Sequence, residues 1–327
     1  MPQIVVENLR KSFHIAQRRP GIMGALASVV RRRHRTVHAL DGVNFIIDRG
    51  ELVGYIGPNG AGKSTTVKIL SGILVPTAGR CEIEGRVPWR ERVAHVRDIG
   101  VVFGQRTQLW WDLPVIESFE LLRDIYRVPH TSYRRTREEL VATLDLAPLL
   151  DVPVRQLSLG QRMRCDLAAA LLHEPSILFL DEPTIGLDAA SKLAVRAFIK
   201  QINTRRGVTV ILTTHDMDDI EALCSRVMVI GNGSVLCDGT LADLRRQVTR
   251  ERHLIVDLAE ADGWRGEPGW GQLIEHASGR VRLAFDPDTL SPAELIAQVT
   301  ATHAVRDLFV ENPPIEQVVT RLYEGGA

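Results

Sequence analysis

The sequence predicts an α/β fold with a mainly parallel sheet, followed by a small α+β domain. Strands and helices alternate over residues 1–240, and the two central strands, at 176–181 and 209–214, are rich in apolar residues. Such strands are typical of a parallel sheet that is covered by helices on both faces. Near Gly239 the pattern changes to an α+β style. The 327 residues agree with a division into two domains, which we place at 1–240 and 241–327.

Periodicity and turn signals place the individual elements. In the first domain we expect strands at 4–13, at 45–57 (two strands around a turn at Arg49-Gly50), and at 81–85, 99–104, 177–181, 209–215 and 227–233. We expect helices at 63–74, 161–172, 189–205 and 217–224, with a helical subdomain inserted at about 106–160. In the second domain we expect strands at 253–258, 280–286 and 305–311, helices at 292–300 and 314–323, and a loop at 263–271.

The charge of the chain is balanced overall but unevenly distributed. Its formal net charge of +0 comes from 40 basic and 40 acidic side chains and excludes a strongly basic nucleic-acid binder. No acidic residue lies between Glu7 and Asp41, a segment that holds eight basic residues. The longest apolar stretch near the N-terminus, at 22–30, is far shorter than the ~20 residues that cross a bilayer. If the protein works at a membrane, we therefore expect another chain to span it.

A glycine-rich loop between a predicted strand and a predicted helix carries the strongest motif. It reads Gly57-Pro58-Asn59-Gly60-Ala61-Gly62-Lys63-Ser64-Thr65 and matches G-x-x-x-x-G-K-[ST]. Glycines let backbone N–H groups approach phosphate oxygens, and the N-terminus of the helix adds its positive dipole end. Lys63 is placed to contact the β- and γ-phosphates, and the Ser64 hydroxyl to ligate Mg²⁺. The loop therefore predicts a nucleotide phosphate site.

Polar side chains follow three of the predicted strands. Asp181 is placed to hold Mg²⁺, directly or through water, and Glu182 to orient and deprotonate an attacking water. His215 ends the next strand and could contact a γ-phosphate. Gln105 follows the strand at 99–104 and could reach Mg²⁺ or the attacking water. Because the carboxyl ends of parallel strands converge on the ligand site, we expect these side chains to face the loop.

Together these residues resemble the ATP-binding subunits of ABC transporters. Residues 157–161 (LSLGQ) are similar to the family signature LSGGQ, with Leu159 where glycine is usual. Asp188 resembles the D-loop aspartate, and Phe13 lies where the family carries an aromatic that stacks on adenine. The resemblance covers residues 3 to about 240. It implies a P-loop NTPase (ABC ATPase) core with a helical subdomain, and an ATPase that uses ATP and Mg²⁺.

The resemblance also implies a head-to-tail homodimer that sandwiches two ATP molecules. In this family the signature of one subunit caps the ATP held by the other, so Ser158, Gly160 and Gln161 would act in trans. A serine hydroxyl and free N–H groups at a helix N-terminus suit contact with a γ-phosphate. Because Glu182 and His215 are both present, each site of the homodimer is expected to hydrolyse ATP.

The segment 103–115 (FGQRTQLWWDLPV) resembles bacterial ABC-2-type exporter ATPases more closely. Trp110 and Trp111 follow Gln105, where the family docks the coupling helix of a membrane permease. For one of the two, packing inside the helical subdomain is equally expected. The resemblance thus implies a separate permease, transport out of the cell, and a peripheral position on the cytoplasmic face of a bacterial cell membrane.

A basic insertion at about 14–38 exceeds what a simple family member needs. Residues 21–30 followed by RRRHR at 31–35 predict a short amphipathic or apolar helix with a basic end. It could lie on anionic lipid, contact the permease, or be a solvated loop.

We expect no nucleic-acid partner. Two other functions stay open: a soluble, non-transport ABC ATPase that acts on ribosomes or nucleic acid, and an ATP-binding module without turnover. The single P-loop and the lack of a heptad run speak against the first, and Glu182 against the second.

Overall fold

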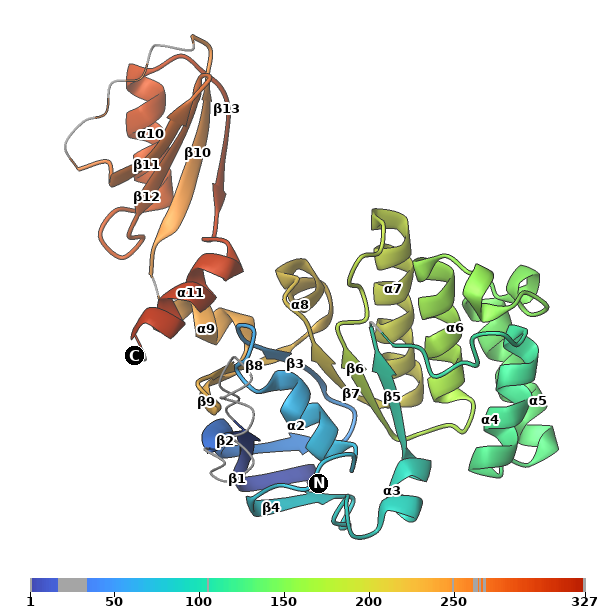
Figure 1. Ribbon diagram of the computed structural model, residues 1–327. Coiled ribbons are helices and arrows are strands. Elements are labelled where there is room, and N and C mark those ends of the chain that lie inside the picture. The colour runs from blue at the N-terminus through green and yellow to red at the C-terminus, as the bar shows by residue number, and fades with distance from the viewer. Residues whose placement is uncertain are drawn as a thin grey trace, which may run out of the picture. The chain divides into compact units, whose positions relative to one another are not determined.

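The computed structural model describes residues 2–16, 34–104, 106–248, 250–260, 264, 266 and 269–325. The chain divides into two compact units, residues 1–239 and 240–327 (Figure 1). The first unit has two sheets and the second has one, and each unit has its own apolar core. The fold class predicted from the sequence is confirmed: a mixed α/β core precedes an antiparallel sheet with helices.

A six-stranded sheet organises the first unit, in the order β5-β6-β7-β3-β8-β9. Its strands are β3 (Leu52–Ile56), β5 (Ile99–Phe103), β6 (Ile177–Asp181), β7 (Thr209–Thr213), β8 (Arg226–Gly231) and β9 (Ser234–Gly239). The five strands from β5 to β8 pair in parallel, and β9 pairs antiparallel with β8. All side chains of β3 and β7 are buried, which explains their uninterrupted apolar character.

A second, antiparallel sheet packs against the first one through helix α2 (Lys63–Leu70). It contains β1 (Pro2–Ala16), β2 (His34–Asp48) and β4 (Ala78–Ile83), in the order β2-β1-β4. Val67 and Ile69 of α2 lie in one core with Val6 of β1 and Phe179 of β6. Helix α2 ends four residues earlier than predicted, because Gly72 adopts the left-handed φ of +73° that terminates a helix.

Strands β1 and β2 run further than predicted and shorten the expected insertion. Their pairing continues to Ala16 opposite His34, so residues 14–16 and 34–38 are strand rather than insertion. The backbone hydrogen bonds of a two-stranded ladder hold these residues without needing a buried face. The short helix predicted from residues 21–30 and the basic residues at 31–33 lie outside the described residues. The last two residues of the basic cluster, His34 and Arg35, are described as part of β2.

Helices cover the other face of the six-stranded sheet. They are α6 (Leu159–Leu171), α7 (Ala189–Arg206) and α8 (Met217–Leu223). Close packing explains two strand glycines: a Cβ on Gly54 would lie 2.7 Å from Ile220 Cδ1 of α8, and one on Gly100 would lie 2.5 Å from the Ala170 carbonyl oxygen of α6. Before α6 come α3 (Arg92–Asp98), α4 (Val115–Tyr126), α5 (His130–Thr143) and the short 3₁₀ turns Ala147–Leu149 and Val154–Gln156.

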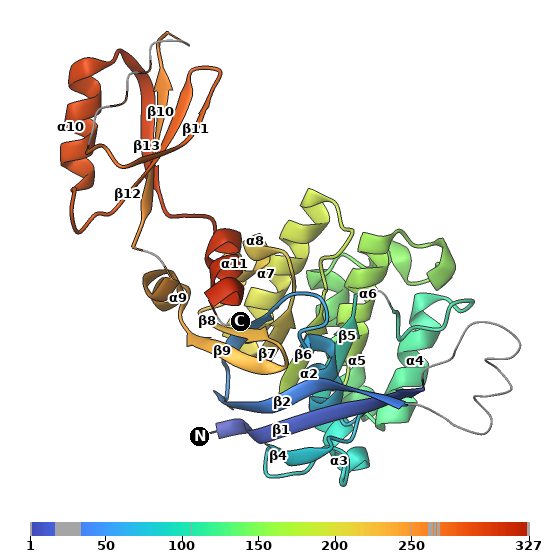
Figure 2. The same ribbon diagram turned by 60° about the vertical axis from the view of Figure 1, so that its left-hand side comes forward.

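The second unit is an antiparallel sheet with a helix on one face (Figure 2). Its elements are α9 (Leu241–Val248), β10 (Arg252–Leu258), β11 (Gln272–Ala277), β12 (Arg280–Phe285), α10 (Pro292–Thr302), β13 (Val305–Glu311) and α11 (Ile315–Gly325). The strand order is β11-β12-β10-β13. Leu254 and Leu283 of the sheet share a core with Leu295 and Val299 of α10.

Two elements of this unit have no counterpart among the predicted ones. Strand β11 escaped prediction because all six of its side chains are exposed, so it lacks the apolar–polar alternation of a half-buried strand. Helix α9 is only eight residues long, and Leu244 is its one fully buried apolar side chain among those described. Strand β11 therefore lacks the hydrophobic period on which the prediction of elements depends. Helix α9 does carry apolar residues at helical spacing, at 241, 244 and 248, but over little more than two turns.

Candidate active site

The loop between β3 and α2 has the backbone conformation of a phosphate cradle. Gly60 and Gly62 adopt positive φ values of +84° and +113°, which side chains of L-residues rarely tolerate. A Cβ on Gly62 would also lie 2.7 Å from the Ala39 carbonyl oxygen. Only glycine fits this position. The loop can therefore turn its N–H groups toward an anion at the start of α2.

Lys63 lies inside this loop and is held by the loop's own carbonyl oxygens. Its Nζ donates to Gly57 O at 2.6 Å and to Pro58 O at 3.2 Å. Burial lowers the pKa of the Lys63 ammonium, while the nearby carboxylates of Glu182 and Asp181 raise it. Phosphate oxygens are stronger acceptors than neutral carbonyls, so an incoming nucleotide could replace these contacts.

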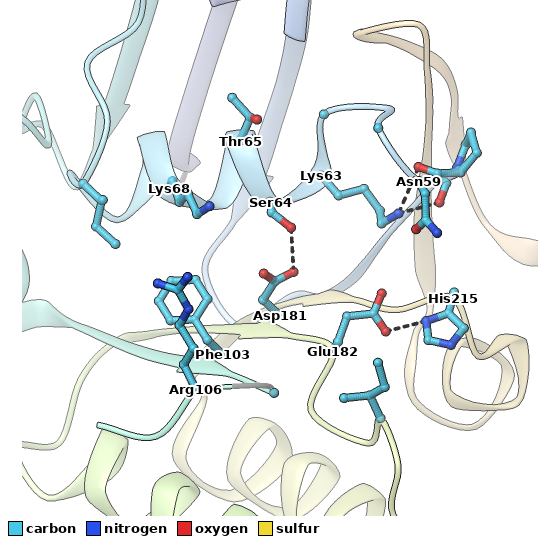
Figure 3. A pocket seen from close by; sticks show the side chains of 17 residues that line it. Asn59, Lys63, Ser64, Thr65, Lys68, Phe103, Arg106, Asp181, Glu182 and His215 are labelled. Carbon is cyan, nitrogen blue, oxygen red and sulfur yellow. Dashed lines mark hydrogen bonds and ion pairs between the residues drawn. The ribbon is translucent and has the colours of Figure 1, made fainter. Parts of the chain in front are cut away.

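Asp181, at the end of β6, points its carboxylate at the start of α2 (Figure 3). Its Oδ1 accepts from Ser64 Oγ at 3.3 Å and also from the hydroxyl of Thr213 at the end of β7. A hydroxyl and a carboxylate are oxygen donors, and Mg²⁺ is commonly held by one or two carboxylates together with substrate phosphates. The donor set therefore fits Mg²⁺. Among the described residues no cluster of three or more His, Cys, Asp or Glu offers a different metal site.

Glu182 faces the same space and contacts His215 (Figure 3). Its Oε2 lies 2.6 Å from His215 Nδ1, and its backbone N–H donates to Thr213 O at 2.9 Å. The Glu182 side chain is 21% exposed and that of His215 is 61% exposed, so both are reachable from solvent. The backbone of Glu182 has a φ of +57°, a left-handed conformation that is costly for a residue with a side chain.

Gly104, which follows β5, packs directly on the Glu182 backbone. Its N–H donates to Asp181 O at 2.7 Å. A Cβ on Gly104 would lie only 2.0 Å from Glu182 O. The left-handed turn at Glu182 is thus supported by a neighbour that has no side chain.

These segments enclose one cavity of about 840 Å³. Of the residues predicted from the sequence, it is lined by Gly57, Pro58, Asn59, Gly60, Gly62, Lys63, Ser64, Thr65, Asp181, Glu182 and His215. Ala61 is buried and does not line it. Gln105 lies outside the described residues.

Several lining residues were not predicted from the sequence. Lys68 of α2 and Arg106 add two cations to the wall, and Phe103 adds an aromatic ring (Figure 3). Lys68 lies one helical turn after Ser64, a spacing that could have indicated it. Thr213, which positions Asp181, had a weaker signal as the polar end of an apolar strand.

The remaining predicted residues do not line this cavity. Phe13 lies on β1 opposite Val37, with Lys11 Nζ 5.2 Å from the centre of its ring. Ser158 is the N-cap of α6 and forms a capping box with Gln161: Gln161 N donates to Ser158 Oγ at 3.2 Å, and Ser158 N to Gln161 Oε1 at 2.9 Å. Gly160 lies against α7, since its Cβ would be 2.6 Å from Ser191 Oγ.

Asp188 is also separate from the cavity and serves as the N-cap of α7. Its carboxylate accepts from Ser191 N at 2.8 Å and from Ser191 Oγ at 3.0 Å. The backbone hydrogen bond from Ser191 lowers the pKa of Asp188, as does the bond from the Ser191 hydroxyl. The turn that precedes α4 exposes two indoles, Trp110 at 38% and Trp111 at 51%.

Comparison with known proteins identifies this arrangement. The family model described as ABC transporter matches residues 40–185. The daunorubicin resistance ATP-binding protein DrrA3 of Streptomyces coeruleorubidus is 38% identical over 230 residues, which are 70% of this chain and 72% of that protein. The chain belongs to the ABC transporter family. It is an ATP-binding subunit, and its reaction is the hydrolysis of ATP.

Other ABC transporter relatives extend over almost the whole chain. The Nod factor export ATP-binding protein I of Ralstonia nicotianae is 32% identical and aligns with 90% of this chain and 91% of its own length. The methionine import ATP-binding protein MetN of Geobacillus kaustophilus is 29% identical, with coverages of 92% and 87%. The relatives of this ABC transporter subunit therefore include proteins named for export and for import.

Solved ABC cassettes share the fold of the first unit. One is a dimeric cassette in a post-hydrolysis state bound to ADP and Pi, with a TM-score of 0.61, 27% identity, and coverage of 73% of this chain and 98% of that chain. Cassettes of this family dimerise and bind nucleotide. None of the helices in the described ranges combines the length and the apolar composition needed to cross a membrane.

Proposed function

We propose that two copies of this chain enclose two ATP molecules and that their closure and reopening drive export through a separate permease. The observation that carries this proposal is the division of the motif residues within one chain. The P-loop, Asp181, Glu182 and His215 line one cavity, whereas Ser158 and Gly160 lie outside it. A head-to-tail homodimer would bring the second group of one copy to the cavity of the other.

Each residue has a distinct role in this proposal. Lys63 and the loop N–H groups bind the phosphates, and Ser64 and Asp181, with Gln105, hold Mg²⁺. When bound, Mg²⁺ neutralises charge on the β- and γ-phosphates. Glu182 accepts a proton from the attacking water, and His215 orients the Glu182 carboxylate and contacts the γ-phosphate.

The remaining residues contact the nucleotide from other positions. Phe13 stacks on adenine, and Asp188 lies at the D-loop. The signature residues of the partner copy act in trans: Ser158, Gly160 and Gln161.

The hydrogen bond between Glu182 and His215 supports the role of Glu182 as the general base. A general base must hold its lone pair toward the water that it deprotonates. At 2.6 Å, His215 Nδ1 fixes one oxygen of the Glu182 carboxylate and leaves the other available. The carboxylate is still 21% exposed, so water can reach it.

Replacing Glu182 tests the catalytic assignment. The Glu182→Gln variant keeps the size and hydrogen bonding of the side chain but removes the basic oxygen. We expect it to lose about 10²–10⁴-fold in ATP turnover while binding ATP, and to accumulate as an ATP-bound dimer in size-exclusion chromatography with light scattering. The exposed Glu138→Gln on α5 is the matched control. Unchanged turnover in Glu182→Gln would contradict the proposal.

Relatives named for export or drug resistance are more identical to this chain than the methionine importer and favour export, while the exposed indoles favour docking on a permease. The protein named for Nod factor export aligns with 90% of this chain at 32% identity. Trp110 and Trp111, which follow Gln105 in the sequence, are exposed, and aromatic residues are favoured anchors at protein interfaces. These indoles suit the coupling helix of a permease. In this proposal the subunit works at the cytoplasmic face of a bacterial cell membrane.

A transport assay separates export from import. The chain is co-purified with the membrane protein that it binds and reconstituted into vesicles with the ATPase on the outside. For an exporter, external ATP drives the substrate into the vesicles. Release of preloaded substrate would identify an importer. Copurification with ribosomes or nucleic acid in place of a membrane protein would favour a non-transport ATPase.

A further inference from the structure

The second unit contains a cavity of about 550 Å³ that is rich in arginine. Four arginines line it: Arg245 and Arg246 of α9, Arg250, and Arg252 at the start of β10. The segments that follow β12 and β13 complete the wall with residues 287–288 and 312–313. Three stretches that are distant in the sequence thus build one concave surface.

The cavity is rich in basic side chains although the second unit as a whole has more acidic than basic residues. From Leu241 onward the chain has 9 basic and 14 acidic residues, and four of those nine line this cavity. The two acids in the wall are each engaged by an arginine: Arg250 Nη1 lies 2.8 Å from Asp288 Oδ2, and Arg321 Nη2 lies 3.0 Å from Glu251 Oε2. Outside the wall, Asp243 pairs with Arg246 at 2.5 Å.

Arg252 has the least compensated environment of the four. Its side chain is partly buried, and its Nε is buried without a hydrogen-bond partner among the described residues. A buried donor that lacks an acceptor costs free energy. In native proteins such a donor calls for an explanation, and one explanation is a ligand that binds there. A bound anion would supply the acceptor.

We propose that this cavity binds a phosphate-bearing anion at a site separate from the P-loop. Guanidinium groups form paired hydrogen bonds to phosphate oxygens, and arginine is favoured where such planar recognition is needed. The volume of 550 Å³ lies within the range of small-molecule sites, about 300–1,000 Å³, so more than one phosphate group fits. A phosphorylated small molecule and a phospholipid headgroup share this chemistry.

Binding of pyrophosphate to the full chain tests the proposal. To silence the first site, we would use the Lys63→Ala background and measure affinity by isothermal titration calorimetry. Adding Arg252→Gln is expected to weaken binding at least about tenfold. Adding Arg280→Gln is the matched control, because it removes the same charge from the same unit outside the cavity and should leave the affinity unchanged. ATP turnover of Arg252→Gln with Lys63 intact checks that the variant is folded.

Two results would overturn the proposal: no binding in the Lys63→Ala background, or equal losses in the Arg252→Gln and Arg280→Gln variants. A second measurement identifies the source of the phosphate. Sedimentation with phosphatidylglycerol vesicles, and not with phosphatidylcholine vesicles, in a manner that requires Arg252, indicates a headgroup. Pyrophosphate binding that requires Arg252 without such sedimentation indicates a soluble phosphorylated molecule.

Discussion

At the scale of single residues, the least ordinary backbone in the candidate site belongs to Glu182. A positive φ of +57° is unfavourable for glutamate and persists only where neighbours hold it. The hydrogen bond from Glu182 N to Thr213 O and the close approach of Gly104 provide that support. The direction of the Glu182 carboxylate therefore depends on a glycine that bears no reactive group.

Gly104→Ala is expected to impair ATP turnover more than ATP binding. The new Cβ would collide with Glu182 O, 2.0 Å away, and the carboxylate would be displaced while the P-loop stays intact. Steady-state turnover and nucleotide affinity, measured together, separate the two effects.

Gly207→Ala is the control for a general loss of stability. Gly207 caps α7 with a φ of +64° and has open space around its Cα, so its substitution strains a helix end far from Glu182 in the fold. Equal turnover in the Gly104→Ala and Gly207→Ala variants would show that Gly104 has no special role.

At the scale of elements, helix α6 joins the signature segment to the segment after Gln105. Asp166 of α6 is only 4% exposed. Its carboxylate accepts from Thr107 Oγ1 at 2.8 Å and from Gln108 N at 3.1 Å. Burial raises the pKa of Asp166 to about 6, although these hydrogen bonds oppose the shift. The junction between two motif segments thus contains a carboxyl group that resists ionisation.

This raised pKa predicts a pH dependence of stability. Between the ordinary value of 3.8 and about 6, the folded chain holds a proton that the unfolded chain has lost. The contribution of Asp166 to the free energy of unfolding therefore falls as pH rises through this window and is constant above it. Asp166→Asn should gain stability relative to the wild type across the window, by up to ~3 kcal/mol.

Urea unfolding of both proteins at several pH values between 4 and 7 measures this difference. The exposed Asp112→Asn serves as the control for a general effect of removing one carboxylate. A difference between Asp166→Asn and the wild type that does not change with pH would contradict the assignment.

Local motifs made much of the candidate site predictable from the sequence. The residues at 57–65 are contiguous, and Asp181, Glu182 and His215 each follow an apolar strand, so strand order was not needed to bring them together. The contacts that shape the site depend on three-dimensional packing instead. The approach of Gly104 to Glu182 and the pairing of Phe13 with Val37 of β2 follow from turn geometry and strand register, which the linear pattern does not encode.

At the scale of the whole molecule, the proposed dimer makes each ATP site a product of two chains. A chain with an inactive P-loop can then rescue a chain with an inactive signature. Lys63→Ala disables the P-loop, and Ser158→Asp disables the signature. Aspartate at position 158 still caps α6 but places a negative charge next to phosphate. Neither variant should hydrolyse ATP alone, and an equimolar mixture should recover part of the activity.

Ser158→Asn is the matched control for this experiment. Asparagine caps helices about as well as serine or aspartate but carries no charge, so the stability of α6 is preserved in all three proteins. We expect Ser158→Asn to keep more activity than Ser158→Asp. A mixture of Lys63→Ala and Ser158→Asp that stays inactive, although the chains form mixed dimers, would contradict action in trans.

The two carbonyl oxygens that hold Lys63 also bear on how the site empties. An ammonium group in a buried place needs an acceptor at every stage. As phosphate groups leave, the oxygens of Gly57 and Pro58 are already within reach, at 2.6 and 3.2 Å in this structure. The loop therefore acts as a stand-in ligand for its own lysine, and the departure of product becomes an exchange of partners that leaves no buried cation without an acceptor.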